Sequence, residues 1–268
     1  MRATTLDLAA LTKLFNEGFS DYFVPFSFDE AGFRHHLDDN DIDLGASRVV
    51  IDDRPVSFAL IGRRDTEAWI AGMGTVPSHR RLGLGERAIG AAIEAAFARG
   101  CREVWLEVLE DNQAAFQLYT KLGFRLRRDL IVWSLPATGV PASSEPPADL
   151  QAARAWIRAN RASREPWQRA DATVDRLLER GVALRGAVVR DRGEVAAALV
   201  YRDDGPTVGV LQIAATDEAA AAEALTAAAA GRPLRLANVP TDEPVSPALE
   251  QLGAGQVARQ HELHLTLG

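Results

Sequence analysis

Two halves of the chain repeat the same order of strand and helix patterns, and this repeat limits the fold more than any other feature. Val56-Ser-Phe-Ala-Leu60 is similar to Val195-Ala-Ala-Ala-Leu199 at a shift of 139 residues (56 to 195). Leu122-Gly123 returns as Leu252-Gly253 at a shift of 130 (122 to 252). Alternating apolar residues predict strands, and apolar residues at helical spacing predict helices. We therefore expect an α/β (α+β) protein with two tandem copies of one fold, each a mostly antiparallel, twisted mixed sheet flanked by helices. Two unrelated α/β halves are the alternative.

A proline-rich segment separates the two halves. Residues 136–149, PATGVPASSEPPAD, contain four prolines and mostly small residues, a composition typical of linkers. We expect one domain over residues 1–135, a linker over residues 136–147 and a second domain over residues 148–268. A chain of 268 residues is long enough for two domains of ordinary size.

Composition excludes several classes of function. The net charge of −7 argues against nucleic acid as a partner. No apolar run approaches the ~18 residues that span a membrane, and the N-terminal residues lack a signal-peptide pattern, so we expect a cytoplasmic protein. Cys101 is the single cysteine, which precludes an internal disulfide, and we expect it in the core. The five histidines are scattered, and we expect no metal site.

The second half is shorter by nine residues (139 against 130), and the missing residues fall on Pro77–Gly85. This stretch contains the pattern Arg80-x-x-Gly83-x-Gly85 at the start of a predicted helix. The first N–H groups of a helix are unpaired and carry partial positive charge, and glycine lets an anion approach them closely. The pattern therefore predicts a phosphate site; a glycine-rich helix start without a ligand is the alternative.

Together with a second element, this loop resembles the GNAT superfamily of N-acetyltransferases. The first element of that superfamily, Arg/Gln-x-x-Gly-x-Gly/Ala, corresponds to Arg80, Gly83 and Gly85. Its second element corresponds to Asn112, Ala115, Tyr119, Gly123 and Phe124. The resemblance covers about residues 1–135. Residues 148–268 share only the expected topology, so we expect a tandem protein whose second half is a degenerate copy without the pyrophosphate loop.

The resemblance implies acetyl-CoA as co-substrate and no metal. It implies that the main chain of Arg81–Glu86 surrounds the pyrophosphate and that the main chain of Met73–Val76 pairs with the pantetheine arm. Asn112, Phe116 and Tyr119 are implied beside the thioester. The complete set implied for acetyl-CoA is Met73, Gly74, Thr75, Val76, Arg80, Arg81, Leu82, Gly83, Leu84, Gly85, Glu86, Asn112, Ala115, Phe116 and Tyr119.

Acetyl transfer to an amine needs a base for the ammonium proton and an acid for the departing thiolate. We expect Tyr119 to be the acid, because the resemblance puts it beside the sulfur and a phenol keeps its proton at pH 7. We expect Glu107 to be the base, because its strand, WLEV, resembles that of ribosomal-protein acetyltransferases with a proposed strand glutamate base. A core aromatic and a solvated carboxylate are the respective alternatives.

The second half serves as an internal control. At the shift of 130, Glu107, Asn112 and Tyr119 become Ala237, Asp242 and Leu249. The loop, the base and the acid are absent together, so we expect one active site, in the first half.

The acceptor side is less clearly marked. Residues 16–26, NEGFSDYFVPF, lie where the first two helices of the superfamily form the acceptor wall. We expect Glu17, Asp21, Tyr22 and Phe23 to face an amine-bearing small molecule or peptide; an ordinary helix end with solvated acids is the alternative. The sequence predicts an acetyl-CoA-dependent N-acetyltransferase that transfers directly in a ternary complex. A non-catalytic acyl-CoA-binding or sensing protein is the other hypothesis, and monomer and homodimer are equally compatible with the pattern.

Overall fold

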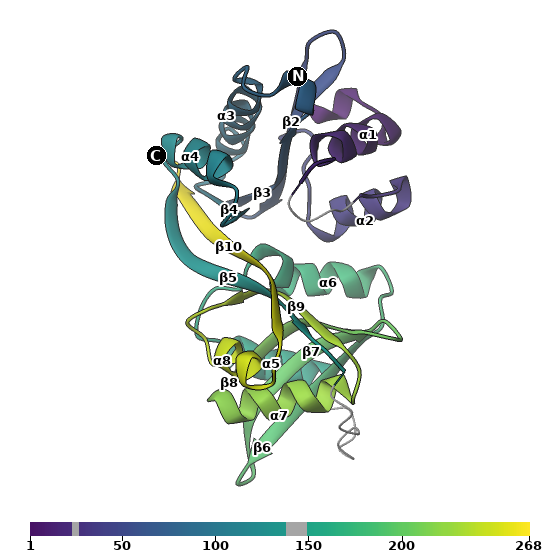
Figure 1. Cartoon of the computed structure of the whole chain (residues 1–268), viewed down its shortest axis with the longest axis vertical. Coiled ribbons are helices and arrows are strands. Elements are labelled where there is room, and N and C mark those ends of the chain that lie inside the picture. The colour runs from purple at the N-terminus through teal and green to yellow at the C-terminus, as the bar shows by residue number, and fades with distance from the viewer. Residues whose placement is uncertain (23–26, 138–148) are drawn as a thin grey trace. The chain divides into compact units, whose positions relative to one another are not determined.

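The chain forms two compact units in the computed structural model, which describes residues 1–22, 27–137 and 149–268. Unit 1 contains Met1–Arg127 together with His261–Gly268. Unit 2 contains Arg128–Gln260 (Figure 1). The strands predicted from alternation and the helices predicted from 3.6-residue spacing are present in both units, which confirms the mixed α/β fold class.

The division between the units differs from the expected one at residues 136–147. Two long strands, β5 (Arg125–Leu135) and β10 (Gly255–Thr266), each begin in one unit and end in the other. The proline-rich segment therefore follows the part of β5 that already belongs to unit 2. Most of the expected linker, residues 138–147, lies outside the described residues.

Unit 1 is a mixed sheet with helices on both faces. Its strands have the order β1-β2-β3-β4-β10-β5, with β1, β2 and β3 antiparallel and β4 parallel to β3. Figure 1 shows α1 and α2 on one side of β2 and β3, and α3 on the other. The elements confined to unit 1 are η1 (Ala3–Thr5), α1 (Leu8–Gly18), α2 (Glu30–Asp39), β1 (Arg48–Ile51), β2 (Pro55–Arg64), β3 (Glu67–Thr75), η2 (Pro77–His79), α3 (Leu84–Phe97), β4 (Glu103–Leu109) and α4 (Gln113–Lys121).

Unit 2 repeats this order of elements. Its strands have the order β10-β5-β9-β8-β7-β6, again with one parallel pair, β8 and β9. The elements confined to unit 2 are α5 (Leu150–Asn160), η3 (Trp167–Arg169), α6 (Asp171–Glu179), β6 (Leu184–Asp191), β7 (Glu194–Asp203), β8 (Val208–Ala215), α7 (Glu218–Ala229), β9 (Leu234–Pro240) and α8 (Val245–Gln251).

The irregularities of strand pairing in the two units coincide, which supports a repeated fold. The register of β2 on β3 shifts between Leu60 and Ile61, and that of β7 on β8 shifts between Val200 and Tyr201. These positions are 140 residues apart (60 to 200), one more than the shift of 139 read from the sequence. The extra residue lies in the turn between β6 and β7, because Val50 and Val189 in the preceding strands are still 139 apart.

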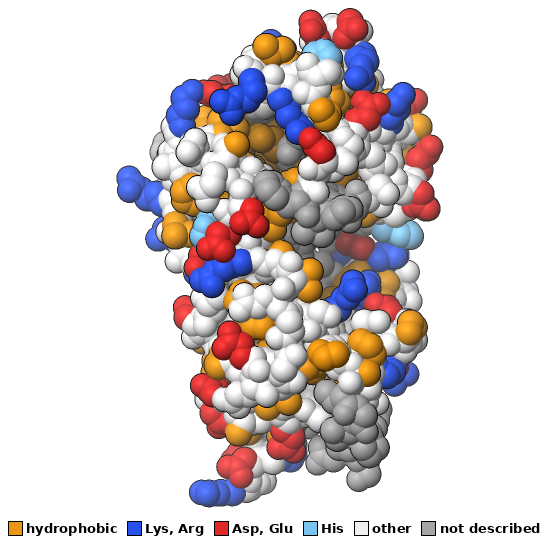
Figure 2. Space-filling view, in the orientation of Figure 1, with side chains coloured by type: hydrophobic (Ala, Val, Ile, Leu, Met, Phe, Trp, Pro, Cys, Tyr) orange, Lys and Arg blue, Asp and Glu red, His pale blue; other side chains and the backbone are white. Residues whose placement is uncertain are grey.

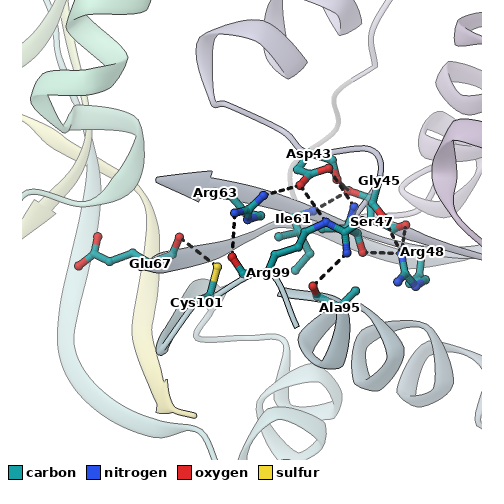
Figure 3. A network of polar contacts seen from close by, with 11 residues as sticks. Asp43, Gly45, Ser47, Arg48, Ile61, Arg63, Glu67, Ala95, Arg99 and Cys101 are labelled. Carbon is teal, nitrogen blue, oxygen red and sulfur yellow. Dashed lines mark hydrogen bonds and ion pairs between the residues drawn. The ribbon is translucent and has the colours of Figure 1, made fainter. Parts of the chain in front are cut away.

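A polar network anchors the end of α3 to the sheet of unit 1 (Figure 3). Asp43 accepts a hydrogen bond from Arg63 on β2 at 2.8 Å, and Arg99, just beyond α3, lies 3.5 Å from the same carboxylate. Burial alone would raise the pKa of Asp43, but the hydrogen bonds from Arg63 and the Ala46 amide lower it overall. Cys101, beside this network, is buried, as its sequence context predicts. The network fixes α3, whose opposite end carries the glycine loop.

Candidate functional site

β3 and β4 diverge, and the gap between them is the first feature of the candidate site. They pair at Glu67–Trp69 with Glu103–Trp105. Beyond these residues β3 continues to Thr75 and β4 to Leu109, with no further pairs in the part of the chain that the structure describes. The edge of β3 that faces the gap can therefore pair with an extended, amide-bearing ligand as it would with an added strand, although the carbonyl of Thr75 already accepts a hydrogen bond from Arg80.

The start of α3 adjoins this gap and is built to leave its backbone accessible. Gly83 is the N-cap at φ +73°, a conformation that favours glycine, and among the described residues no side chain caps the helix there. Arg81 is also left-handed, at φ +66°. A Cβ on Gly85 would lie 3.3 Å from Thr75 Oγ1, so this glycine lets the helix start pack closely against β3. Figure 2 shows Lys and Arg side chains gathered over the part of unit 1 that contains α3.

Unit 2 treats the corresponding helix start differently. Val76–Gly83 connect β3 to α3, whereas Thr216 and Asp217 alone connect β8 to α7. Asp217 is the N-cap of α7, and its carboxylate accepts a hydrogen bond from the Ala220 amide at 2.9 Å. The position that an anion would take is thus filled by the chain's own carboxylate.

The cleft beside α7 is also acidic. A cavity of about 600 Å³ there is lined by residues that include the carboxylates Asp217, Glu218, Asp242 and Glu243. Negative charge at this place would repel phosphate groups. The second half of the chain therefore has the same order of elements, but the segment that corresponds to the glycine loop is not suited to bind phosphate groups.

Two of the predicted ligand residues are engaged with each other. The guanidinium of Arg80 pairs with the carboxylate of Asp21 and also donates to the carbonyls of Gly18 and Thr75. Arg80, predicted for acetyl-CoA, and Asp21, predicted for the acceptor, thus meet where α1 ends and the glycine loop begins. The hydrogen bonds from Arg80 lower the pKa of Asp21.

Other charged candidates form ion pairs at the edges of the site. Glu86 in the first turn of α3 pairs with Lys121 at the end of α4, with N–O distances of 2.7 and 2.8 Å. Glu17 pairs with Arg54 in the turn between β1 and β2 at 2.7 Å. The first pair holds α3 against α4, and the second holds α1 against that turn.

Tyr22 lies near two residues of α4: Asn112 at the N-cap and Tyr119 in the second half of the helix. Asn112 caps the helix by accepting from the Ala115 amide at 3.2 Å, and its side chain is hydrogen-bonded to Tyr22. Tyr119 is the buried side chain of α4. Burial, and secondarily the nearby Tyr22, raises the pKa of Tyr119, so its phenol keeps its proton at neutral pH. Ala115 and Phe116 occupy the same helix and are partly buried against the unit 1 core.

Glu107 lies on the opposite face of β4 from Tyr119. Leu106 and Val108 belong to the core cluster that contains Tyr119, and side chains alternate along a strand. The indole of Trp69 on β3 donates to Oε2 of Glu107 at 2.8 Å, which fixes the orientation of the carboxylate. The pairing of β3 with β4 ends at Trp69 and Trp105, so Glu107 lies on the part of β4 that diverges from β3.

Sequence reasoning missed several of these contacts. The hydrogen bond from Trp69 to Glu107 depends on the register of β3 against β4, which a local sequence pattern does not specify. His261 and His264 of β10 contact Phe116 and Trp105, and nothing in the local pattern indicates that the last strand joins unit 1. Phe23, predicted for the acceptor, lies outside the described residues.

The sequence predicts no metal site and no membrane-spanning segment, and the described residues bear on both predictions. Among them, a carboxylate and histidine group of the kind that binds metal ions is formed by Asp52, Asp53 and His79, whose donor atoms lie within 4.8 Å of one another; the two aspartates are exposed. Nowhere in the described ranges is there a helix of the length and apolar character required to cross a bilayer.

The diverging strands β3 and β4, the register shift between β2 and β3 and the helix start at Gly83 together indicate the fold of an acyltransferase. Residues 8–124 match the model of the Acetyltransferase (GNAT) family, so unit 1 carries a domain of that family. The ribosomal protein bS18-alanine N-acetyltransferase of Salmonella typhimurium is 35% identical over 77 residues, which are 29% of this chain and 52% of that protein. The chain thus spans about half the length of this relative.

Solved structures match over the whole chain. A GCN5-related N-acetyltransferase from Sphaerobacter thermophilus has a TM-score of 0.70 at 16% identity, covering 97% of this chain and 92% of that one. A tandem GNAT protein from the clavulanic acid biosynthesis pathway has a TM-score of 0.62 at 15% identity, covering 100% and 97%. At these identities the matches show the fold, and they show that a tandem arrangement of two GNAT folds exists elsewhere.

Proposed function

We propose that unit 1 is an acetyl-CoA-dependent N-acetyltransferase that moves an acetyl group directly to a primary amine while both substrates are bound. The proposal rests on three features that occur together: a helix start at Gly83 that no side chain caps among the described residues, the gap between β3 and β4, and the Glu107 carboxylate on the diverging part of β4. In unit 2 the helix start is capped by Asp217, and Ala237 stands where Glu107 would be.

Acetyl-CoA fits the residues of unit 1. Main-chain N–H groups of Arg81–Glu86 would hold the pyrophosphate, because the start of α3 carries partial positive charge and no side chain caps it among the described residues. The edge of Met73–Val76 holds the pantetheine arm. When bound, the thioester supplies the acetyl group.

Glu107 acts as the base. A lysine-like amine with a pKa near 10.4 is protonated at pH 7, and removing its proton costs about 4.6 kcal/mol. Glu107 accepts that proton from the incoming ammonium group, leaving a neutral nitrogen to form the N–C bond. The indole of Trp69 keeps the carboxylate of Glu107 in one orientation, because it donates a hydrogen bond to Oε2.

Tyr119 acts as the acid. As the C–S bond breaks, the phenol donates its proton to the departing sulfur. The nitrogen, positively charged once the N–C bond has formed, loses its second proton, which returns to the phenolate through solvent, and Glu107 releases the first proton to solvent. The raised pKa of Tyr119 keeps this proton in place until the transfer. Orienting both reactants in the gap contributes up to roughly 7–11 kcal/mol of barrier lowering, more than either proton transfer.

The acceptor is a small molecule or peptide with a primary amine. The Salmonella relative is named for acetylating an alanine of a ribosomal protein. A peptide α-amine therefore belongs with lysine side chains, polyamines and aminoglycosides among the acceptors to be tested.

An amine panel tests the proposal. The purified chain is incubated with acetyl-CoA and each amine class, including a peptide that begins with alanine, and free thiol is measured together with the mass of the product. We expect thiol release that depends on one amine class, with an acetylated product. Tight acetyl-CoA binding without release for any amine would instead identify an acyl-CoA-binding or sensing protein.

A further inference from the structure

The last strand of the chain is a structural part of unit 1. β10 lies beside β4 in the strand order, and the amide of Leu267 donates to the carbonyl of Arg102 at 2.7 Å. Residues 261–268 follow unit 2 in the sequence, yet they complete the sheet of unit 1 between β4 and β5. The strand that carries Glu107 is therefore flanked by a strand from the far end of the chain.

On one face of β4, His264 packs against Trp105. Their ring centroids are 4.2 Å apart with planes inclined by 35°. Trp105 and Glu107 are two residues apart and so point to the same side of the strand. His264 is only 6% exposed, so neighbouring residues restrict the position of its ring against the indole of Trp105.

Two neighbours fix the ring of His264 at its edges. Nη2 of Arg127 lies 3.0 Å from Nδ1, and a guanidinium can only donate, so Nδ1 accepts. The proton of the neutral ring is then on Nε2, which lies 3.4 Å from a carboxylate oxygen of Glu103. The ring is held from β4 on one side and from β5 on the other.

On the opposite face, β10 supports α4. His261 meets the ring of Phe116 edge-on at 5.2 Å, and Leu263 lies in the core cluster that contains Tyr119. A Cβ on Gly123, just after the helix, would lie 3.4 Å from Cδ1 of Leu265, and Leu265 itself packs against the unit 1 core. The same strand thus touches β4, which carries Glu107, and α4, which carries Tyr119.

We propose that His264 is a positioning residue of the acetyl-transfer site: its ring holds Trp105, and with it the segment of β4 that aims Glu107 at the acceptor amine. The inference rests on the proposed function for its effect on turnover. This role also explains how the second half of the chain contributes to the site, because the strand that ends this half completes the sheet of unit 1.

The experiment compares three variants of the full chain. His264→Ala removes the ring. His264→Phe keeps the ring on Trp105 and loses only the polar contacts to Glu103 and Arg127, both of which reach solvent. Thr266→Ala changes an exposed side chain of the same strand and serves as the matched control. For each variant, kcat and the KM values for acetyl-CoA and amine are measured, and hydrogen–deuterium exchange of the β4 amides is followed.

We expect His264→Ala to lower kcat by about 10- to 100-fold, since small misplacements of reacting groups cost factors of this size. The KM for acetyl-CoA should stay within about twofold, because its predicted binding residues on the glycine loop and β3 are not contacted by His264. His264→Phe should restore at least about a third of the wild-type kcat. The β4 amides should exchange faster in His264→Ala than in Thr266→Ala.

Every other outcome counts against the inference or against the proposed function. An unchanged kcat in His264→Ala overturns the inference, as does a loss that His264→Phe, shown by circular dichroism to be folded, fails to restore. If the wild-type chain acetylates no amine, the proposed function fails separately, and the exchange of β4 then decides the positioning role. Equal β4 exchange in His264→Ala and Thr266→Ala overturns it.

Discussion

Arg80 and Asp21 form a bidentate ion pair. Nη1 of Arg80 lies 2.7 Å from Oδ2 of Asp21, and Nη2 lies 2.6 Å from Oδ1. The same guanidinium donates to the carbonyl of Thr75 at 3.0 Å and to that of Gly18 at 3.2 Å. One side chain thus ties the end of α1 to the end of β3, directly before the glycine loop. We therefore expect Arg80 to shape the proposed acetyl-CoA site through the backbone contacts it makes.

Arg80→Met is therefore expected to weaken acetyl-CoA binding by about tenfold, because the loop loses three attachments at once. Asp21→Asn should weaken it by less than about threefold, since the carbonyl contacts of Arg80 remain and an exposed ion pair is worth little. Titration calorimetry measures both, with Arg125→Met as a control on an exposed arginine elsewhere in unit 1. Equal losses for the Arg80 and Asp21 variants would contradict the assigned role.

Glu107→Gln should reduce kcat/KM by about 10²- to 10⁴-fold at pH 7, the range of a lost general base. The reduction should shrink as the pH approaches the pKa of the amine, because neutral amine then forms in solution. Glu110→Gln, on the exposed loop after β4, is the control. A pH-independent deficit would assign Glu107 to structure instead.

Tyr119→Phe should lower kcat at least about tenfold with little change in acetyl-CoA affinity, because the ring remains packed and only the phenolic proton is lost. Single-turnover kinetics isolate the chemical step. If that rate equals the wild-type rate, Tyr119 is a core residue and another group protonates the sulfur.

His36 makes the stability of unit 1 depend on pH. Its ring stacks on Phe28 with centroids 5.2 Å apart, and burial lowers the pKa of His36 from 6.5 to about 4, with the charge of Asp39 opposing. Between these values the unfolded chain binds a proton that the folded chain does not, so stability is complete above pH 6.5 and falls as the pH drops toward 4. The loss amounts to about 3 kcal/mol.

Urea unfolding at pH 7 and pH 4.5 measures this loss. Part of the decrease belongs to other groups, so the comparison is with His36→Leu, which removes the titrating ring and keeps an apolar side chain beside Phe28. The decrease should be smaller in the variant by about 2–3 kcal/mol. Parallel decreases in the two proteins would show that His36 titrates normally.

The local parts of the fold could be predicted from the sequence, because their causes are local. Periodicity located the strands and helices of both halves. The position of the glycines predicted the start of a helix, and in the structure Gly83 is the N-cap of α3 at positive φ. The repeat was visible because two copies of one fold share turns and helix ends, although the one-residue offset before β7 required the strand register.

Contacts between distant strands could not be predicted in the same way. An alternating strand pattern specifies which side chains share a face, but the neighbouring strand is chosen by the whole sheet. The sequence therefore assigned the last strand to the second half, whereas His261–Gly268 belong to unit 1. For the same reason the bond from Trp69 to Glu107 and the stack of His264 on Trp105 became visible only in the structure.

We propose a single acetyl-CoA site, at the start of α3, and titration calorimetry with acetyl-CoA measures whether it exists. We expect one molecule bound per chain, with affinity at least about tenfold weaker in Gly83→Val, because a β-branched residue is strained at φ +73°. Asp217→Ala, at the counterpart in unit 2, should bind as the wild type does. Two molecules per chain, or full binding by a folded Gly83→Val protein, would rule out a single site at this helix start.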